Sequence, residues 1–179
     1  DNVFSNYAYQ IGNEEIALHK RISISIKPKD EYIDDTLLYV ARLNKEGELI
    51  YVGNKYNGEY IEANTNVLGI YLIAKDSVSS EHKFIAFLSS NDKFFDNFNS
   101  NSSITDNWSL RVEIEDKETG VYKYDMYVND DWVLADYDAK NNLLVYQIDH
   151  HIKQGNNTLK IVVSDMLGNE TVYTTVLHR

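Results

Sequence analysis

The sequence Trp108-Ser109-Leu110-Arg111-Val112-Glu113-Ile114-Glu115 decides the fold class. Apolar residues occupy every second position and alternate with polar ones. Because successive side chains of a β-strand point to opposite faces, this alternation predicts a strand with one buried face. A similar pattern continues to Arg179, with short apolar runs separated by turns rich in Gly, Asn and Asp. Short strands at this spacing indicate an antiparallel β-sandwich rather than an α/β sheet.

The predicted strands of this half cover residues 83–89, 108–115, 121–129, 132–137, 143–148, 158–163 and 170–177. Residues 91–107, rich in Asn, Asp and Ser, are predicted as a surface loop with one helical turn around 94–98. Asp165 with Gly168-Asn169 predicts a tight corner, because Gly and Asn adopt positive φ at low cost. Asp116 and Gly120 predict a comparable corner.

The first half of the chain carries a similar pattern. Ile-Ser-Ile-Ser-Ile within residues 21–27 is the cleanest predicted strand. Residues 36–44 and Leu49–Gly53 flank a Lys-Glu-Gly-Glu turn and predict a hairpin. Asn57-Gly58 predicts a second hairpin turn. The nearly continuous apolar run 67–74 indicates a strand that is buried on both faces or lies near a domain interface.

A short polar stretch without periodicity, residues 76–82, separates the two halves. We therefore expect an all-β chain of two tandem antiparallel β-sandwich domains, Ig-like or fibronectin III-like. The predicted domains are residues 1–78 and 79–179. The chain begins at Asp1 rather than Met, so we expect it to be a piece of a longer protein.

Composition limits the classes of partner. The net charge of -11 disfavours nucleic acid and anionic membrane surfaces, because both require a cationic face. No apolar run approaches the roughly 20 residues that span a bilayer, so membrane insertion is not expected. The absence of cysteine excludes disulfides, thiolate metal sites and a Cys nucleophile.

Two clusters of polar residues invite a chemical interpretation. His150-His151 resembles a metal-ligand pair, but adjacent residues on a strand point to opposite faces and could not share one ion easily. A polar turn before Gly155-Asn156-Asn157 is the preferred interpretation of this pair. The acidic group Asp130, Asp131, Asp136 and Asp138 could act as paired carboxylates on a sugar, or simply form turns. Turns are the preferred interpretation, and no nucleophile or phosphate-loop motif occurs. We therefore assign no catalytic, cofactor-binding or metal-binding residue and expect no enzymatic activity.

Exposed aromatic residues are the remaining candidates for a binding surface. Trp132 and Tyr137 are candidate contacts to a glycan or a partner, whereas Trp108 lies on an apolar strand face and is predicted to be core. The oxygen-rich residues 91–107 could hold Ca²⁺, although they do not match an EF-hand loop.

Two passages carry a family resemblance: residues 11–20 followed by the Ile-Ser-Ile-Ser-Ile strand, and residues 132–144 followed by residues 155–160 and 163–169. Together they resemble the region that follows the catalytic domain in M23-type (LytM-like, lysostaphin-type) zinc peptidases of Bacteroidetes. The resemblance implies two Ig-like β-sandwich modules without a catalytic domain. The family's zinc ligands, in HxxxD and HxH motifs, do not occur in this sequence. The junction also differs, since relatives often carry Asp-Thr-x-x-Pro-Pro where this chain has Asp76-Ser77-Val78-Ser79-Ser80.

The resemblance implies a non-catalytic accessory or positioning module of an exported, periplasmic or cell-surface protein. Its partner would be peptidoglycan or another envelope protein. Two alternatives stay open: a glycan-binding or adhesion module, and a calcium-stiffened structural spacer.

Overall fold

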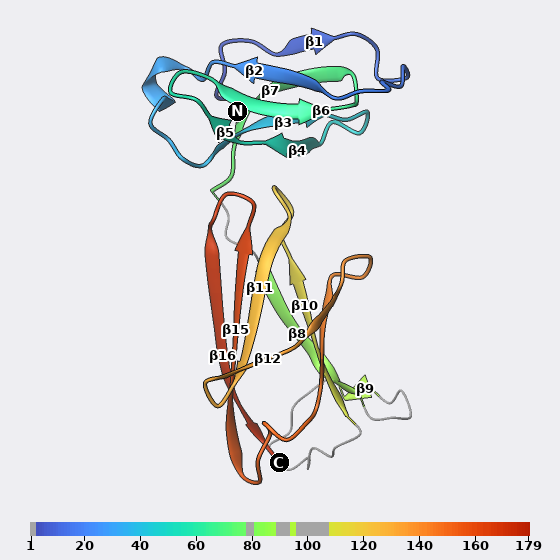
Figure 1. The fold of residues 1–179 in the computed structure, drawn as a ribbon, viewed down its shortest axis with the longest axis vertical. Coiled ribbons are helices and arrows are strands. Elements are labelled where there is room, and N and C mark those ends of the chain that lie inside the picture. The colour runs from blue at the N-terminus through green and yellow to red at the C-terminus, as the bar shows by residue number, and fades with distance from the viewer. Residues whose placement is uncertain (1–2, 78–80, 89–93, 96–107) are drawn as a thin grey trace. The chain divides into compact units, whose positions relative to one another are not determined.

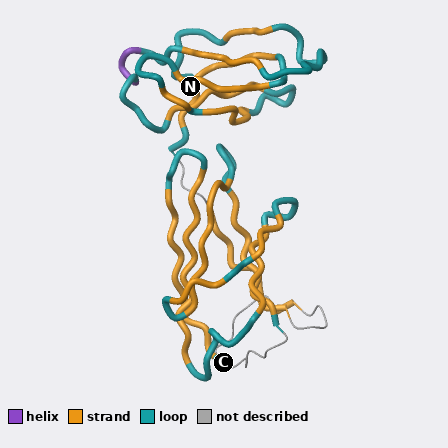
Figure 2. Tube along the Cα trace, viewed as in Figure 1, coloured by secondary structure: helices purple, strands orange, loops and turns teal. Residues whose placement is uncertain are grey.

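The computed structural model describes residues 3–77, 81–88, 94–95 and 108–179. The chain divides into two compact units, Asp1–Val78 and Ser79–Arg179. In both units every strand pair of the described residues is antiparallel, and one 3-10 turn, η1 (Asp30–Tyr32), is the sole helical element among them (Figure 1; Figure 2). The predicted all-β class is confirmed.

The first unit is built from two sheets. One has the order β1-β7-β3-β4 and the other β2-β6-β5. Their bounds are β1 Tyr9–Ile11, β2 Ile22–Ile26, β3 Leu38–Leu43, β4 Leu49–Gly53, β5 Lys55–Tyr56, β6 Ile61–Thr65 and β7 Gly69–Lys75.

The core of the first unit follows the alternation seen in the sequence. In β2, Ile24 and Ile26 are buried while Ser23 and Ser25 are exposed. β7 is different, since four consecutive residues from Tyr71 are buried. A strand in the interior of a sheet that is covered on both faces shows this pattern, as predicted for the apolar run.

The second unit is a sandwich of two sheets with the orders β13-β14-β10-β8-β9 and β12-β11-β15-β16. Their bounds are β8 Glu81–Leu88, β9 Phe94–Phe95, β10 Ser109–Glu115, β11 Val121–Val128, β12 Asp131–Val133, β13 Asp136–Asp138, β14 Leu143–Gln147, β15 Asn156–Asp165 and β16 Glu170–His178. The inward residues of both sheets form one apolar core. Leu110, Val112 and Ile114 of β10 are fully buried in it, and Trp108 packs against its border.

Two sequence predictions for this unit were wrong. The strand predicted over residues 132–137 is two strands, because the chain leaves the β11 sheet after Val133 and joins the β14 sheet at Asp136. Buried and exposed residues keep alternating between β12 and β13, so periodicity alone does not reveal the change of sheet. The helical turn predicted around 94–98 is contradicted at Phe94–Phe95, which form the short strand β9 paired with β8; the rest of that loop lies outside the described residues.

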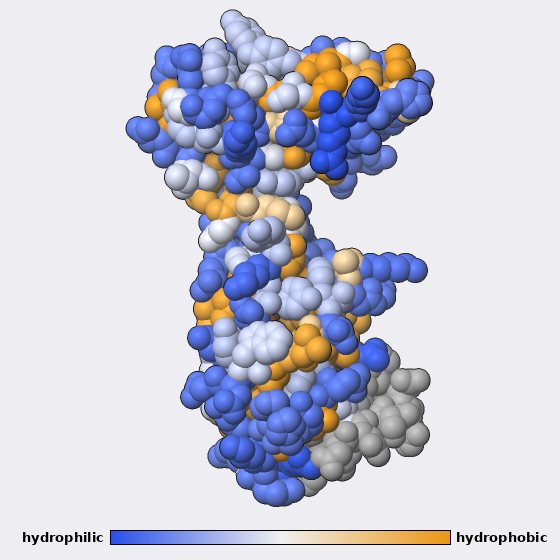
Figure 3. Space-filling view, viewed as in Figure 1, coloured by the Kyte–Doolittle hydropathy of each residue, from blue (hydrophilic) through white to orange (hydrophobic). Residues whose placement is uncertain are grey.

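Hydrophilic residues dominate the face drawn in Figure 3, and hydrophobic residues appear between them in small groups. Among the described residues, no helix is both long and apolar enough to cross a membrane.

Candidate functional site

Trp132 stands on a tight hairpin between β11 and β12. Asn129 and Asp130 form its two-residue turn with φ of 53° and 69°. Positive φ at both positions is the type I′ geometry that matches the twist of antiparallel strands. The turn sets Trp132 directly opposite Tyr127, on the face of the sheet that points away from the core. There the indole is 55% exposed.

A hydrogen bond to a paired carboxylate holds the exposed indole in place. Trp132 Nε1 donates to Asp125 Oδ1 at 3.2 Å, and Lys123 Nζ contacts the other carboxylate oxygen at 2.6 Å. The hydrogen bond from Lys123 lowers the pKa of Asp125, burial opposes this, and the bond from Trp132 lowers it further, so the pKa lies below its ordinary value. The carboxylate is therefore ionised at neutral pH and keeps accepting from the indole.

A hollow of about 320 Å³ opens beside this ring. Trp132, Tyr122 and Leu134 line it, together with Lys123 and Asp125. Tyr122 is 69% and Leu134 70% exposed, which is unusual for large apolar side chains. Aromatic and aliphatic surface next to a fixed charge pair offers both a stacking plane and hydrogen-bonding groups. We call Tyr122, Trp132 and Leu134 the Trp132 surface.

Tyr137, the second candidate contact from the sequence, lies on β13 and not among the residues that line the hollow. Its hydroxyl donates to Asn142 Oδ1 at 3.4 Å, and its ring packs on Tyr124 with centroids 5.4 Å apart. Burial raises the pKa of Tyr137, and neighbouring Glu115, Tyr124 and Asp138 raise it further. Tyr137 thus packs on Tyr124, a residue that lines the hollow, and does not line the hollow itself.

The four clustered aspartates are distributed over turns and two sheets. Asp130 occupies the hairpin turn, and Asp131 and Asp136 lie on strands of different sheets. Asp138 accepts hydrogen bonds from Lys140 N at 3.1 Å and Asn141 Nδ2 at 2.7 Å. The Asn141 bond is the main reason that the pKa of Asp138 is lowered. These contacts are those of turn formation.

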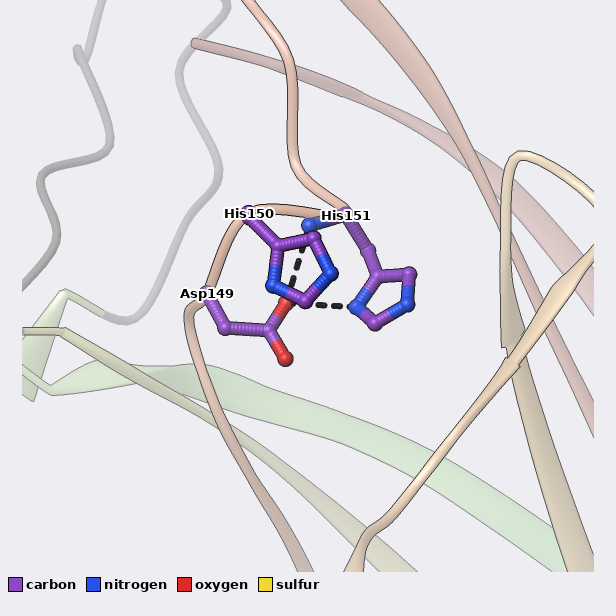
Figure 4. A group of neighbouring side chains, drawn as sticks. All are labelled: Asp149, His150 and His151. Atoms are coloured by element: carbon purple, nitrogen blue, oxygen red, sulfur yellow. Dashed lines mark hydrogen bonds and ion pairs between the residues drawn. The ribbon is translucent and has the colours of Figure 1, made fainter.

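His150 and His151 lie in a turn after β14 with their rings side by side, centroids 4.1 Å apart (Figure 4). The premise that they point to opposite faces was wrong, because it assumed a strand. Ligand atoms of Asp149, His150 and His151 lie within 4.8 Å of one another.

The carboxylate of Asp149 already accepts several hydrogen bonds within this turn. Its Oδ1 accepts from the Tyr146 hydroxyl, from His151 N at 3.0 Å and from His151 Nδ1 at 2.9 Å. Burial raises the pKa of Asp149, but these three donors outweigh it and the pKa is lowered. An ionised carboxylate only accepts, so Nδ1 of His151 carries the proton. The hydrogen bonds of this cluster therefore stabilise the turn.

The predicted corners are also held by carboxylates. Asp165 accepts from Leu167 N at 2.8 Å and Asn169 N at 2.9 Å, with Gly168 at φ of 88°. Asp116 Oδ1 accepts from Thr119 N at 2.7 Å and Gly120 N at 2.8 Å. The calcium prediction for residues 91–107 falls outside the described residues, apart from the two of β9.

Sequence patterns did not identify Tyr122, Leu134 or Asp125 as part of a surface. Tyr122 lies at the irregularity in the pairing of β11 with β15, and Leu134 sits where the chain changes sheets. Tyr122 escapes the simple two-residue period, whereas Leu134 keeps it as an apolar residue on the exposed side of the alternation. A large apolar residue in the outward phase of the alternation was the signal that could have indicated Leu134.

Comparison with known proteins gives a family match for the first unit and a likeness to solved structures. Residues 1–76 match the sequence model of the Zu5-like domain. A solved structure described as fibronectin(III)-like modules of Clostridium thermocellum CbhA is similar at 12% identity and a TM-score of 0.37, over 96% of this chain and 93% of that chain. No curated protein matches the chain. Neither similarity connects the chain to M23-type peptidases. The first unit of this all-β chain is similar to Zu5-like domains.

Proposed function

We propose that this chain is a non-catalytic accessory module of an exported cell-envelope protein, which holds an active domain at peptidoglycan. The exposed but hydrogen-bonded indole of Trp132 is the observation that carries the proposal. An exposed aromatic ring fixed by a carboxylate is pre-ordered for contact and loses little rotamer freedom on binding.

The ligand class follows from the surface around that ring. Pyranose rings carry an apolar C–H face and a rim of hydroxyls. The Trp132 surface and the charged residues beside it offer the matching pair, since Trp132 and Tyr122 supply aromatic planes and the neighbouring Asp125 and Lys123 supply charged hydrogen-bonding groups. The open hollow suits a few sugar residues of a longer strand.

The attached active domain would be an M23-type peptidase. Support for the peptidase comes from the two resembling passages, of which the second, which begins with residues 132–144, includes Trp132 itself. The described carboxylates and histidines fit an accessory role, because Asp138, Asp149 and Asp165 are engaged in shaping turns. Export to the periplasm or cell surface follows from the same proposal.

Co-sedimentation with purified, insoluble peptidoglycan tests the proposal. The full chain should pellet with peptidoglycan and release no soluble fragments, whereas Trp132→Ala should lose at least tenfold in affinity. Tyr7→Ala is the matched control, because Tyr7 is another exposed aromatic residue, 69% accessible, in the first unit. Release of fragments, or equal binding by Trp132→Ala, would contradict the proposal.

A second candidate function is adhesion to a different surface carbohydrate through the same ring. The 55% exposure of Trp132 favours it equally. A glycan array separates the two: peptidoglycan fragments alone should bind in the first case, and other surface glycans in the second.

A further inference from the structure

The outer edge of β16 differs from every other sheet edge that the structure describes. β16 is the last strand of its sheet, and no described strand hydrogen-bonds to its far side (Figure 1). It has nine residues. The other edge strands, β1, β2, β4, β5, β9, β12 and β13, have at most five. Proteins usually keep edges short or charged, because unpaired backbone groups recruit another strand.

The hydrogen-bond pattern identifies which backbone groups face outward. Gly155 and Arg179 exchange both N–H···O bonds at 3.0 Å, so they form a hydrogen-bonded pair. Such pairs recur at every second residue of an antiparallel ladder. The odd-numbered residues of β16 therefore bond to β15, and the even-numbered ones direct N–H and C=O toward the edge.

The side chains of the same even-numbered residues lie on the outer sheet face and are exposed. They are Glu170, Val172, Thr174, Val176 and His178. Val172 is 51% and Val176 54% exposed. The strand contains no Lys, Arg or Pro, the residues that commonly block an edge.

This series of side chains is self-complementary about Thr174. In an antiparallel pair of two copies with Thr174 opposite itself, Val172 meets Val176 of the other copy and Glu170 meets His178. The apolar residues pair with each other, and the carboxylate meets an imidazole that can donate a hydrogen bond or carry a positive charge. Every one of these pairs falls on the outward-facing backbone groups, so each can exchange two backbone hydrogen bonds.

We propose that β16 pairs antiparallel with β16 of a second copy of this chain, with Thr174 on the two-fold axis. The two four-stranded sheets then become one continuous sheet. Trp132, Tyr127, Lys160 and Thr174 lie in one cross-strand row on the outer face. The row continues into the second copy, and the Trp132 residues of the two copies lie on the same face, roughly 34 Å apart at about 4.8 Å per strand.

Single cysteines test the register, since the chain has no cysteine of its own. Residues opposite each other in a hydrogen-bonded pair have Cα atoms about 5.5 Å apart, within disulfide range. Thr174→Cys should form a covalent dimer under mild oxidation. Val172→Cys alone should not, because its counterpart lies about 14 Å along the strand. An equal mixture of Val172→Cys and Val176→Cys should cross-link.

Sedimentation equilibrium of the unmodified full chain supplies the second readout. Two copies, each with a net charge of -11, repel one another, so dimerisation should strengthen as salt is added. Thr174→Pro removes one outward N–H per copy and should shift the chain to monomer. A monomer at all concentrations and salts, or equal cross-linking of Thr174→Cys and Val172→Cys alone, would overturn the proposal. Circular dichroism of each variant verifies that the fold is kept.

Discussion

The carboxylate of Asp149 organises the turn after β14. It accepts from the hydroxyl of Tyr146, a residue that is only 1% exposed, and from the backbone and ring of His151. Burial and this bond to a carboxylate raise the pKa of Tyr146, so the neutral hydroxyl is retained far into alkaline solution. Tyr146→Phe should lower the free energy of unfolding by about 1–3 kcal/mol, because a bond to a charged acceptor is lost. Urea denaturation measures this. Tyr122→Phe, at an exposed position, should change it by less than about 0.5 kcal/mol.

The pH dependence of stability follows from the lowered pKa of Asp149. Since the folded pKa lies below the unfolded value of about 3.9, the carboxylate stabilises the fold above that pH. The contribution is lost as pH falls through the folded pKa. Unfolding free energies of the wild type and Asp149→Asn should therefore differ at pH 7 and converge at acid pH. A gap that stays constant down to the acid limit would contradict the assignment.

The β11–β12 hairpin holds Asp130 at a φ of 69°, a backbone conformation that costs free energy for a residue other than Gly. Gly adopts this region freely, and Asn-Gly is the preferred type I′ pair. Asp130→Gly should raise the free energy of unfolding by about 0.5–1 kcal/mol, whereas Asp130→Val should lower it by more than about 1 kcal/mol. Chemical denaturation of both variants measures whether their changes in unfolding free energy have opposite signs. An equal loss in both would mean that the carboxylate matters more than the backbone.

Strands could be predicted from the sequence where their bounds are set by local residues, and not where they are set by distant partners. β4 has the predicted bounds and β10 nearly so, because alternation is a local property of the chain. The division into β12 and β13 could not be predicted, since a change of sheet is decided by distant partners, β11 and β14. The same limit applied to the site. Trp132 was identified from its residue type, but its partner Asp125 is fixed only by pairing across the hairpin.

At the scale of the whole molecule, each unit has its own apolar core. Ile73 in the first unit and Ile161 in the second are both almost fully buried. Ile73→Ala and Ile161→Ala should each cost about 2–5 kcal/mol within their own unit. Amide hydrogen exchange should show reduced protection in the mutated unit and unchanged protection in the other. Loss of protection in both units from either variant would contradict two separate cores.

NMR tests whether the Trp132 surface binds peptidoglycan without cleaving it. The chain has two tryptophans, so a ¹⁵N-labelled sample gives two indole N–H signals. Titration with soluble peptidoglycan fragments should shift the Trp132 signal to saturation, leave the Trp108 signal in place and leave the fragments intact. An unmoved Trp132 signal at saturating ligand would exclude binding by the Trp132 surface, and fragments that shorten during the titration would show that the chain is catalytic.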